Sequence, residues 1–547
     1  MNFIANETKQ KLRGGYYTPL DLAEFLVNWV KEIKPKNILE PSCGDGIFFD
    51  AIKKVGGLNK INILGIEFNE EEAVKARKKL KKDFSNAVIK NTDFLDWSLK
   101  QLTNEEKNFD AIVGNPPFIR YQYLPKVFQE KSEEVFKILD LPFTKHTNAW
   151  VPFILSSMAL LRPGGRLAMV IPAEIMHVLH AQPLRAYLGR ECKRIVIVDP
   201  QELWFDDTLQ GTVLLLAEKL SSPNEKPEGV GIYPVKGKEF LKLDPAEVFA
   251  TPKSINGRTV KGKWTYALLD PEIRTLIDDL ARHPDVHLFK DVADVDVGIV
   301  TGANNFFLVP DEIVKEFKLK KWAHPMFGRS DHCPGIIYNE DQHNANKENG
   351  KPTNFIWFPQ EAVTVSASAQ QYINYGEKQE LHTRYKCSVR TPWYSVPSVY
   401  KTEVGMLKRS HNTPRLILNE IGAFTTDTAY RIKTNENIDS KQLVGSFVNS
   451  LTALSAELEG RHYGGGVLEL TPSEIEKLLI PLPKNITIDL VDLDNDVRSL
   501  STEELLKQQD RKILRALGLT IEKQNQLLGA WNKLRNRRQR IDDSKIG

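Results

Sequence analysis

The first 220 residues alternate short apolar runs with longer amphipathic stretches. Short apolar runs are typical of strands buried inside a parallel sheet, and amphipathic stretches are typical of helices that cover its faces. The alternation therefore predicts an open, doubly wound α/β sheet with parallel strands. The predicted strands are Asn37–Pro41, Ile61–Glu67, Asp110–Gly114, Arg166–Pro172, Arg194–Asp199 and Thr212–Ala217.

Two helices of this region begin at recognisable capping residues. Thr18 stands directly before Pro19 and three residues before Asp21, so we predict that Thr18 is an N-cap followed by proline at the first helical position. Asn69 and Glu72 have the same spacing and predict a second helix start.

The apolar content falls in the polar, proline-containing stretch 221–229, which is typical of a linker. We therefore assign residues 1–235 to a first domain. Residues 260–482 are richer in aromatic residues and lack the strand–helix rhythm, which predicts a second, mixed α/β domain. Residues 485–547 predict a helical segment, and its basic end, Lys533–Arg540, is equally typical of a solvated helix and of one that contacts phosphates.

The composition is that of a globular protein, with 41% hydrophobic and 27% charged residues. The net charge is only +3, from 74 Lys and Arg against 71 Asp and Glu, so a nucleic-acid-binding surface would have to be local. The start of the chain shows no export signal, no run of about 18 apolar residues occurs, and the four cysteines are scattered. We therefore expect a cytoplasmic protein without a membrane span.

Four residues of the second half could suggest a metal site: His332, Cys333, His382 and Cys387. They lack the paired spacing of zinc ligands, so we interpret them as loop and core residues and expect no metal. The lysine-rich stretch 75–82 is likewise interpreted as a solvated helix face.

The first predicted strand runs into a glycine-bearing turn, Glu40–Gly46, and then into a helix. Gly44 and Gly46 allow the backbone to approach a ligand at the carboxyl end of the strand, where open α/β sheets bind cofactors. Phe49 stands where a dinucleotide-binding fingerprint has its third glycine, which favours a smaller nucleoside ligand over NAD.

Two further segments could contact such a ligand. Glu67 ends the second predicted strand, where a carboxylate can accept hydrogen bonds from both ribose hydroxyls. Asp93 and Phe94 offer an acceptor beside an aromatic wall, which suits the amine and ring of adenine. Taken singly, Glu40, Glu67 and Asp93 are also typical of surface acids at strand ends.

The segment Asn115-Pro116-Pro117-Phe118 follows the third predicted strand. Two successive prolines fix the backbone and remove two N–H donors, which leaves carbonyl acceptors. The amide oxygen of Asn115 and the carbonyl of Pro116 can both accept from one amine, while the Phe118 ring offers a stacking face. This arrangement favours a planar amine as substrate.

These segments resemble the amino-group methyltransferases, whose hallmark is Asn-Pro-Pro followed by Tyr or Phe. Within that group the chain resembles the gamma-type DNA adenine-N6 methyltransferases of restriction–modification systems, because the motifs occur in the same order. The resemblance implies a Rossmann-like catalytic domain that binds S-adenosyl-L-methionine. The cofactor-binding residues it implies are Tyr17, Thr18, Glu40, Pro41, Gly44, Gly46, Glu67, Asp93, Phe94 and Asn115.

The resemblance also implies the rest of the catalytic apparatus. It continues through Asn148-Ala149-Trp150, residues 161–172 and residues 203–205, where an aromatic supplies the second face of the pocket for a flipped base. We assign that role to Phe205, with Trp204 as the alternative. The implied catalytic residues are Asn115, Pro116, Pro117, Phe118 and Phe205.

Residues 297–305 and 461–467 resemble the target-recognition regions of the same enzymes. The resemblance thus implies that 260–482 reads double-stranded DNA, that the chain acts on DNA as a monomer, and that a cognate restriction endonuclease would be a separate chain. The residues of the kind that reach base edges and phosphates are Asn304, Asn305, Arg329, Arg461 and His462.

Two other functions fit parts of this pattern. An RNA or protein-glutamine amine methyltransferase would also need a site for a planar amine, but the long second domain with recognition-type motifs argues against it. A non-catalytic DNA-binding subunit could keep the same fold, but the intact cofactor and acceptor motifs argue against that.

Overall fold

The computed structural model describes residues 18–58, 61–84, 86–104, 107–200, 211–257, 261–358, 365–463 and 465–540. The chain forms two compact units, Met1–Leu268 and Leu269–Gly547. We refer to them as unit 1 and unit 2.

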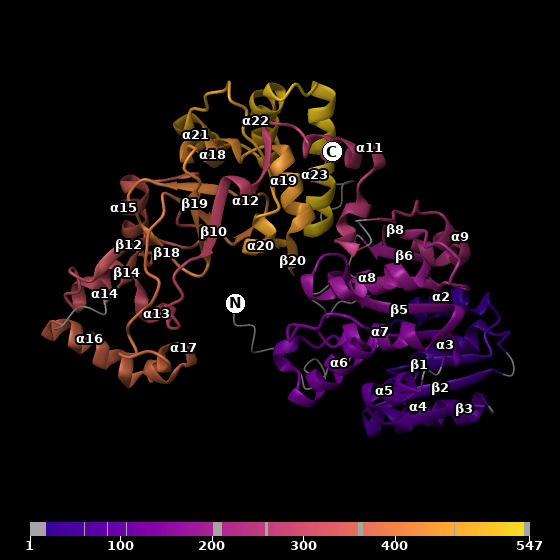
Figure 1. The fold of residues 1–547 in the computed structure, drawn as a ribbon. Helices are drawn as coiled ribbons and strands as arrows, with labels where there is room; N and C mark the ends of the chain where they lie inside the picture. Colours follow the sequence, from indigo (N-terminus) through magenta and orange to yellow (C-terminus); the bar gives the residue numbers. More distant parts are fainter. Residues whose placement is uncertain are drawn as a thin grey trace. The chain divides into compact units, whose positions relative to one another are not determined.

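The described residues of unit 1 form an eight-stranded sheet in the order β3-β2-β1-β4-β5-β7-β6-β8 (Figure 1). All six predicted strands are present, and β3 and β8 were not predicted. The predicted parallel arrangement was wrong at β7, which is antiparallel to both β5 and β6. The strands are β1 Asn37–Glu40, β2 Asn62–Glu67, β3 Ala87–Asn91, β4 Phe109–Gly114, β5 Leu161–Pro172, β6 Cys192–Pro200, β7 Thr212–Lys219 and β8 Gly229–Val235.

Helices cover both faces of this sheet, because successive strand residues point to opposite sides. Ile38 belongs to one buried cluster with residues of α2, α3, α4 and α9, whereas Leu39 belongs to a second cluster with residues of α5 to α8. The helices are α2 Leu20–Lys31, α3 Ile47–Val55, α4 Glu70–Asp83, α5 Phe94–Thr103, α6 Lys126–Ile138, α7 Trp150–Leu160, α8 Gln182–Glu191 and α9 Pro245–Ala250.

One of the two predicted caps of unit 1 is confirmed. Asn69 caps α4 by accepting a hydrogen bond from the backbone N–H of Glu72 at 3.1 Å. The other was wrong, because α2 begins at Leu20 with Pro19 at its N-cap and no side-chain cap. The hydroxyl of Thr18 has a different partner, described below.

Unit 2 is mixed α/β, as predicted. Among its described residues the strands form sheets in the orders β10-β19-β15-β17-β13, β11-β14-β12-β18, β16-β21-β20 and β22-β9. The strands are β9 Val286–Leu288, β10 Ala293–Val297, β11 Leu308–Val309, β12 Ala323–Phe327, β13 Ile337–Tyr338, β14 Asn354–Ile356, β15 Val404–Leu407, β16 Arg409–Ser410, β17 Leu416–Asn419, β18 Phe424–Thr425, β19 Ala429–Thr434, β20 Arg461–Tyr463, β21 Val467–Glu469 and β22 Leu479–Pro481.

Helices of unit 2 pack on these sheets, and the predicted helical ending is confirmed as α21 to α23. Helix α20 begins with a capping box, in which the Thr471 side chain accepts from the backbone N–H of Glu474 and the Glu474 side chain accepts from the backbone N–H of Thr471. The helices are α11 Pro271–Leu280, α12 Phe289–Val292, α13 Asn304–Phe307, α14 Asp311–Glu316, α15 Glu340–Glu348, α16 Ala367–Lys378, α17 Tyr385–Ser388, α18 Ser440–Ser446, α19 Ser450–Glu459, α20 Pro472–Ile475, α21 Leu490–Ser499, α22 Thr502–Ala516 and α23 Ile521–Gln539.

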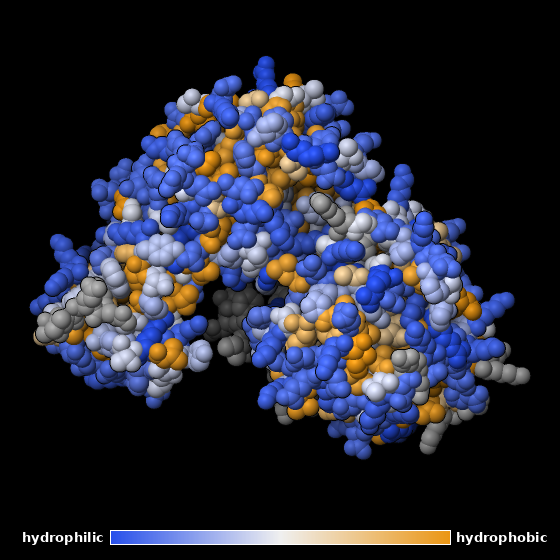
Figure 2. All heavy atoms as spheres, viewed as in Figure 1, coloured by the Kyte–Doolittle hydropathy of each residue, from blue (hydrophilic) through white to orange (hydrophobic). Residues whose placement is uncertain are grey.

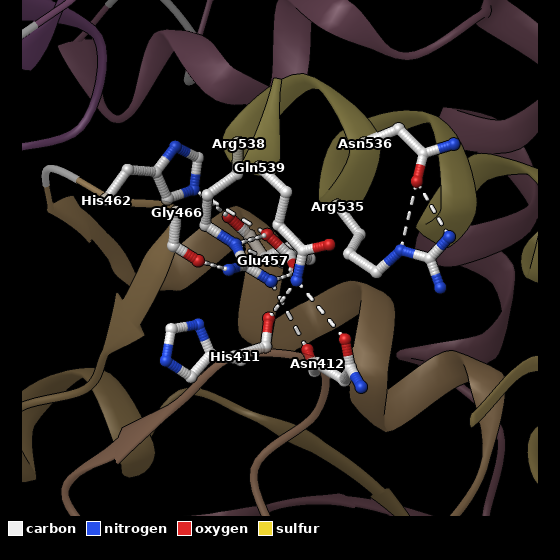
Figure 3. Close-up of polar contacts among 9 residues, drawn as sticks. All are labelled: His411, Asn412, Glu457, His462, Gly466, Arg535, Asn536, Arg538 and Gln539. Carbon is white, nitrogen blue, oxygen red and sulfur yellow. Dashed lines mark hydrogen bonds and ion pairs between the residues drawn. The ribbon is translucent and has the colours of Figure 1, made fainter. Parts of the chain in front are cut away.

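The basic end of α23 is partly buried inside unit 2. Arg538 is fully buried and makes an ion pair with the equally buried Glu457 of α19, with an N–O distance of 2.6 Å (Figure 3). Arg535 lies over the ring of Trp531 at 4.6 Å from its centroid. Arg538 is therefore neither solvated nor free to contact a phosphate, because its guanidinium is buried and paired with Glu457.

Hydrophilic side chains predominate on the face of both units drawn in Figure 2, with apolar residues scattered between them. In the described part of the chain, no helix has the length and apolar character needed to cross a membrane.

Candidate active site

The turn after β1 brings the backbone to the carboxyl edge of the sheet. Its anchor is a hydrogen bond from the N–H of Cys43 to the carbonyl of Ile66 on β2, at 3.0 Å. Gly46 has a φ of +89°, and a Cβ there would lie 2.8 Å from a ring carbon of Phe49. Phe49, which stands at the position of the third glycine of a dinucleotide fingerprint, thus packs against the turn.

Glu67 at the end of β2 faces the same turn. One carboxylate oxygen accepts a hydrogen bond from the N–H of Gly44 at 2.8 Å, and the other accepts from the N–H of Asn69 at 2.7 Å. Burial raises the pKa of Glu67, and these two hydrogen bonds oppose the rise. The carboxylate is therefore held in a fixed orientation beside the glycine turn.

Glu40 is the most buried acid of the site, with 1% of its surface exposed. Its pKa lies well above the usual range because of burial, and the nearby carboxylates of Glu67 and Asp45 raise it further. Among the described residues, its Oε2 atom has no hydrogen-bond partner. A buried carboxylate oxygen without a donor is costly, so this position suits a ligand that brings an ammonium or another N–H group.

Asn115 begins the Asn-Pro-Pro-Phe loop directly after β4. Its backbone carbonyl accepts a hydrogen bond from the Ser42 hydroxyl at 2.9 Å, which ties the loop to the turn after β1. Its side-chain nitrogen donates to the hydroxyl of Thr18 at 3.2 Å. Because the nitrogen is turned to Thr18, the amide oxygen is directed away from it.

The rest of this loop is held by residues of the Asn148-Ala149-Trp150 motif. The side-chain oxygen of Asn148 accepts from the N–H of Tyr121 at 3.0 Å, and its nitrogen donates to Glu174 at 3.2 Å. The N–H of Ala149 donates to the carbonyl of Ile119 at 3.0 Å. Sequence reasoning gave Asn148 no role, although the motif itself was a usable signal.

The prolines and the aromatic ring of the loop differ in exposure. Pro116 is buried, while Pro117 and Phe118 are half-buried. The Phe118 ring packs in part against the hydrophobic cluster of α5 to α8. One part of the ring is thus fixed by the core, which gives it a defined orientation.

Asp93 and Phe94 make contacts that stabilise the fold. The carboxylate of Asp93 accepts from the N–H groups of Leu95 and Asp96 at 2.7 and 3.1 Å, and lies 3.3 Å from the ammonium of Lys131. Phe94 is 3% exposed and belongs to the core. A contact of either with adenine stays a prediction.

Phe68 was missed by sequence reasoning. It directly follows Glu67 and is 77% exposed, which is unusual for a phenylalanine. Asn91 holds this corner by donating to the carbonyls of Glu67 and Phe68 at 2.9 and 3.0 Å. Its position directly after the acid that ends a predicted strand could have indicated Phe68 as a candidate ligand contact.

The remaining predicted residues are placed as follows. Pro41 is buried in the turn after β1. Tyr17, Trp204 and Phe205 lie outside the described residues. The described residues contain no group of three or more His, Cys, Asp or Glu side chains that could hold a metal ion.

Two protein-family models match this chain, one in each unit. The model described as N-6 DNA Methylase matches residues 1–232. The model described as Type II methyltransferase M.Eco57I, C-terminal domain, matches residues 261–514. The two matches follow one another without overlap and leave residues 233–260 and 515–547 unmatched.

Curated relatives extend over most of the chain. Type II methyltransferase M.AccI of Acinetobacter calcoaceticus is 24% identical and the alignment covers 84% of each chain. Type II methyltransferase M.BstVI of Geobacillus stearothermophilus is 22% identical over 92% of this chain and 96% of its own. Type II methyltransferase M.TthHB8I of Thermus thermophilus is 30% identical over 32% of this chain and 39% of its own.

Proposed function

This chain belongs to the N6-adenine DNA methyltransferases of type II restriction–modification systems, and on that premise we propose how its site works. The reaction is transfer of a methyl group from S-adenosyl-L-methionine to the N6 amine of an adenine. We propose that this adenine is flipped out of duplex DNA, and that its methylation protects the site from a separately encoded endonuclease.

The observation that carries this proposal is the convergence of three strand ends on one place. The turn after β1 is bonded to Glu67 at the end of β2, and the same turn is bonded through Ser42 to Asn115 at the end of β4. The order of the sheet reverses between β1 and β4, which is where open α/β sheets bind their ligands. The cofactor and the residues that hold the substrate amine would thus meet between β1 and β4, where the strand order reverses.

The residues of this site fit the proposed cofactor. Bound there, S-adenosyl-L-methionine would supply an electrophilic methyl group. Glu67, already oriented by Gly44, would accept from the ribose hydroxyls. The Oε2 atom of Glu40, which has no hydrogen-bond partner among the described residues, would accept from the ammonium. Gly44 and Gly46 would let the backbone approach the ligand, and the exposed Phe68 would pack against its adenine.

The Asn-Pro-Pro-Phe loop would hold the reacting amine. The amide oxygen of Asn115 and the carbonyl oxygen of Pro116 would accept its two hydrogens, which draws the nitrogen towards a tetrahedral and more nucleophilic geometry. Thr18 orients the amide of Asn115, and Asn148 orients the loop that follows it. The chain would therefore act by positioning.

An adenine amine inside a duplex cannot reach a cofactor bound in the protein, so the base has to leave the helix. Stacking on Phe118, and on Phe205 from the opposite face, would offset the stacking that is lost in the duplex. We further propose that residues 260–482 choose the target sequence and that the enzyme acts as a monomer in the cytoplasm.

Sequencing the DNA of cells that express the chain, by a method that detects methylated bases, tests the proposal directly. N6-methyladenine at one position of one recurring sequence is expected. Expression of the Asn115→Ala variant should give unmodified DNA. Asn62→Ala serves as a matched control, because Asn62 is exposed and its side chain donates to Asn37 at the start of β1. DNA without N6-methyladenine from the wild type would reject the proposed function.

A further inference from the structure

The basic residues of unit 2 that the sequence indicates as possible DNA contacts differ in exposure and in their partners. Arg461 is paired with the fully buried Glu474 at 3.0 Å, and His462 lies 3.7 Å from the fully buried Glu457. Arg461 therefore compensates an acid in the core of unit 2, and His462 lies beside another. Arg329 differs from them, because 62% of its side chain is exposed.

Arg329 lines a polar groove of about 610 Å³ on unit 2. The groove is lined by residues 328–331, which follow β12, by residues 407–409, where β15 ends and β16 begins, and by residues 427–428, which follow β18. Backbone hydrogen bonds fix these walls, because the N–H of Lys408 donates to the carbonyl of Thr428 and the N–H of Asp427 donates to the carbonyl of Ile299, both at 3.1 Å.

Two arginines of this groove each have the Nε atom beside a carboxylate, Arg409 through a hydrogen bond and Arg329 through an exposed ion pair. The Nε atom of Arg329 lies 3.2 Å from the carboxylate of Asp331, and the Nε atom of Arg409 lies 2.6 Å from that of Glu469. Glu469 is 5% exposed, whereas the side chain of Arg409 is 65% exposed. Within the described residues, the terminal nitrogens of both guanidinium groups make no hydrogen bond.

A guanidinium anchored at Nε presents its two terminal nitrogens as a pre-oriented pair of donors. Such a pair matches two oxygens of a phosphate, or the O6 and N7 atoms of a guanine edge. Lys408, whose ammonium lies 3.4 Å from the carboxylate of Glu469, also lines the groove, while Asp427 and Ser330 add acceptors and a hydroxyl donor. This mixture suits duplex DNA, because base edges present both donors and acceptors.

We propose that this groove is a DNA-binding surface of unit 2, and that Arg329 and Arg409 each bind the target duplex through a phosphate or a guanine edge. The inference rests on the proposed function, which makes duplex DNA the substrate. The inference adds where on unit 2 the duplex binds and which two side chains contact the DNA.

The C-terminal helix positions one wall of the groove. Arg409 lies on β16, which pairs with β21, and β21 pairs with β20. Arg538 of α23 donates to the carbonyl of Gly466, between β20 and β21, while it is bonded to Glu457 (Figure 3). The ring of Tyr463 on β20 lies 5.9 Å from the Arg409 guanidinium. The buried ion pair thus fixes the sheet that carries Arg409.

The test compares variants on a duplex that contains the methylated sequence mapped for the wild type. Equilibrium binding is measured across a range of salt concentrations for Arg329→Ala, Arg409→Lys and the wild type, all as full chains. Arg409→Lys retains the charge beside Glu469 but lacks the pair of terminal donors. The control is Arg282→Ala, because Arg282 is 74% exposed, contacts Asp278 and Asp279 of the preceding helix α11, and lies outside the groove.

We expect Arg329→Ala and Arg409→Lys each to weaken binding of the target about 10- to 100-fold, with unchanged cofactor affinity. A phosphate contact predicts weakening on every sequence and, for Arg329→Ala, a salt dependence lower by about one unit of slope. A guanine contact predicts a loss confined to the target, with methylation spreading to sites changed at one base. If both variants keep the affinity, the salt slope and the methylated sites of the wild type, the DNA-binding role of the groove is rejected and the proposed function stands. If the wild type methylates no adenine, the proposed function is rejected as well.

Discussion

The side-chain nitrogen of Asn115 donates a hydrogen bond to the hydroxyl of Thr18, 3.2 Å away and 97 positions earlier in the chain. Thr18 is 4% exposed, so its hydroxyl is fixed by its surroundings. Since a primary amide has its donor and acceptor on opposite arms, fixing the nitrogen also fixes the oxygen. The contact therefore sets the atom that would receive the substrate amine.

Replacing Asn115 by alanine should lower kcat by about 10²- to 10³-fold or more, because a pre-oriented acceptor for the reacting amine is lost. Cofactor affinity should change little, since Glu40 and Glu67 are untouched. Single-turnover methyl transfer and calorimetry measure the two effects separately. An Asn115→Ala enzyme with wild-type kcat would show that the amine is held elsewhere.

Thr18→Val should lower kcat about tenfold without a matching change in the KM for DNA, because the amide of Asn115 loses the partner that orients it. Valine keeps the shape of threonine but cannot accept a hydrogen bond. Thr18→Ser restores the hydroxyl and should restore kcat. Equal kcat values for the valine and serine variants would contradict this positioning role.

Glu67→Ala should weaken binding of S-adenosyl-L-methionine by about 1–3 kcal/mol, the usual cost of removing a charged hydrogen-bond acceptor. The titration is done by calorimetry without DNA, so that base flipping does not contribute. Asp96→Ala is the control, because Asp96 is an exposed acid on α5 that pairs with Lys131. An unchanged affinity in Glu67→Ala would identify Glu67 as an acid that only holds the glycine turn.

Local patterns were sufficient to predict most of the catalytic sheet. The runs that became β1, β2 and β4 are apolar, end at polar residues and are followed by turn residues, so strand and site appear together in the sequence. The apolar pattern of a buried strand does not indicate whether the strand is parallel or antiparallel to its neighbours, so the antiparallel direction of β7 was not predicted. β8 was missed because Gly229–Val235 begins inside the polar stretch that we interpreted as a linker.

Contacts between distant residues account for the remaining differences. Thr18 has the sequence context of an N-cap, but its hydroxyl is bonded to Asn115. A pattern of neighbouring residues cannot predict a partner 97 positions away. Arg538 stands in a basic run that indicates an exposed helix, yet Glu457, 81 positions earlier, draws it into the core. A buried acid is the determining factor there, and its burial depends on the packing of α19 against α23.

The stability of unit 2 should fall as pH rises, through the buried Asp510 of α22. Asp510 is 2% exposed and accepts a hydrogen bond from the N–H of Ser450 at 2.8 Å. Burial raises the pKa of Asp510 to about 7, above its value in the unfolded chain. The folded state therefore binds the proton more tightly, and the stabilisation it gives is complete below pH about 4 and lost as pH rises through about 7.

Asp510→Asn retains an acceptor for Ser450 without a titrating group. Denaturant unfolding between pH 5 and pH 8 should therefore show a smaller loss of stability with rising pH in this variant than in the wild type. Parallel curves for the two proteins would mean that Asp510 does not titrate in this window.

Arg538→Ala should lower the free energy of unfolding of unit 2 by about 3–5 kcal/mol, because it leaves the carboxylate of Glu457 buried without its counter-charge. Glu457 accepts three hydrogen bonds from Arg538, at 2.6, 2.9 and 3.2 Å, and its pKa is raised by burial and lowered by this arginine. Chemical denaturation measures the loss, with the exposed Arg282→Ala as control.

The double variant Glu457→Gln/Arg538→Met separates the charge from the packing. Both residues are fully buried, so the cost of the single variant comes mostly from the uncompensated charge, and removing both charges should recover much of the lost stability. DNA affinity should recover less, because methionine cannot donate to the carbonyl of Gly466 and the sheet that carries Arg409 stays loosened. Full recovery of both stability and DNA affinity would show that the ion pair stabilises unit 2 without positioning the groove.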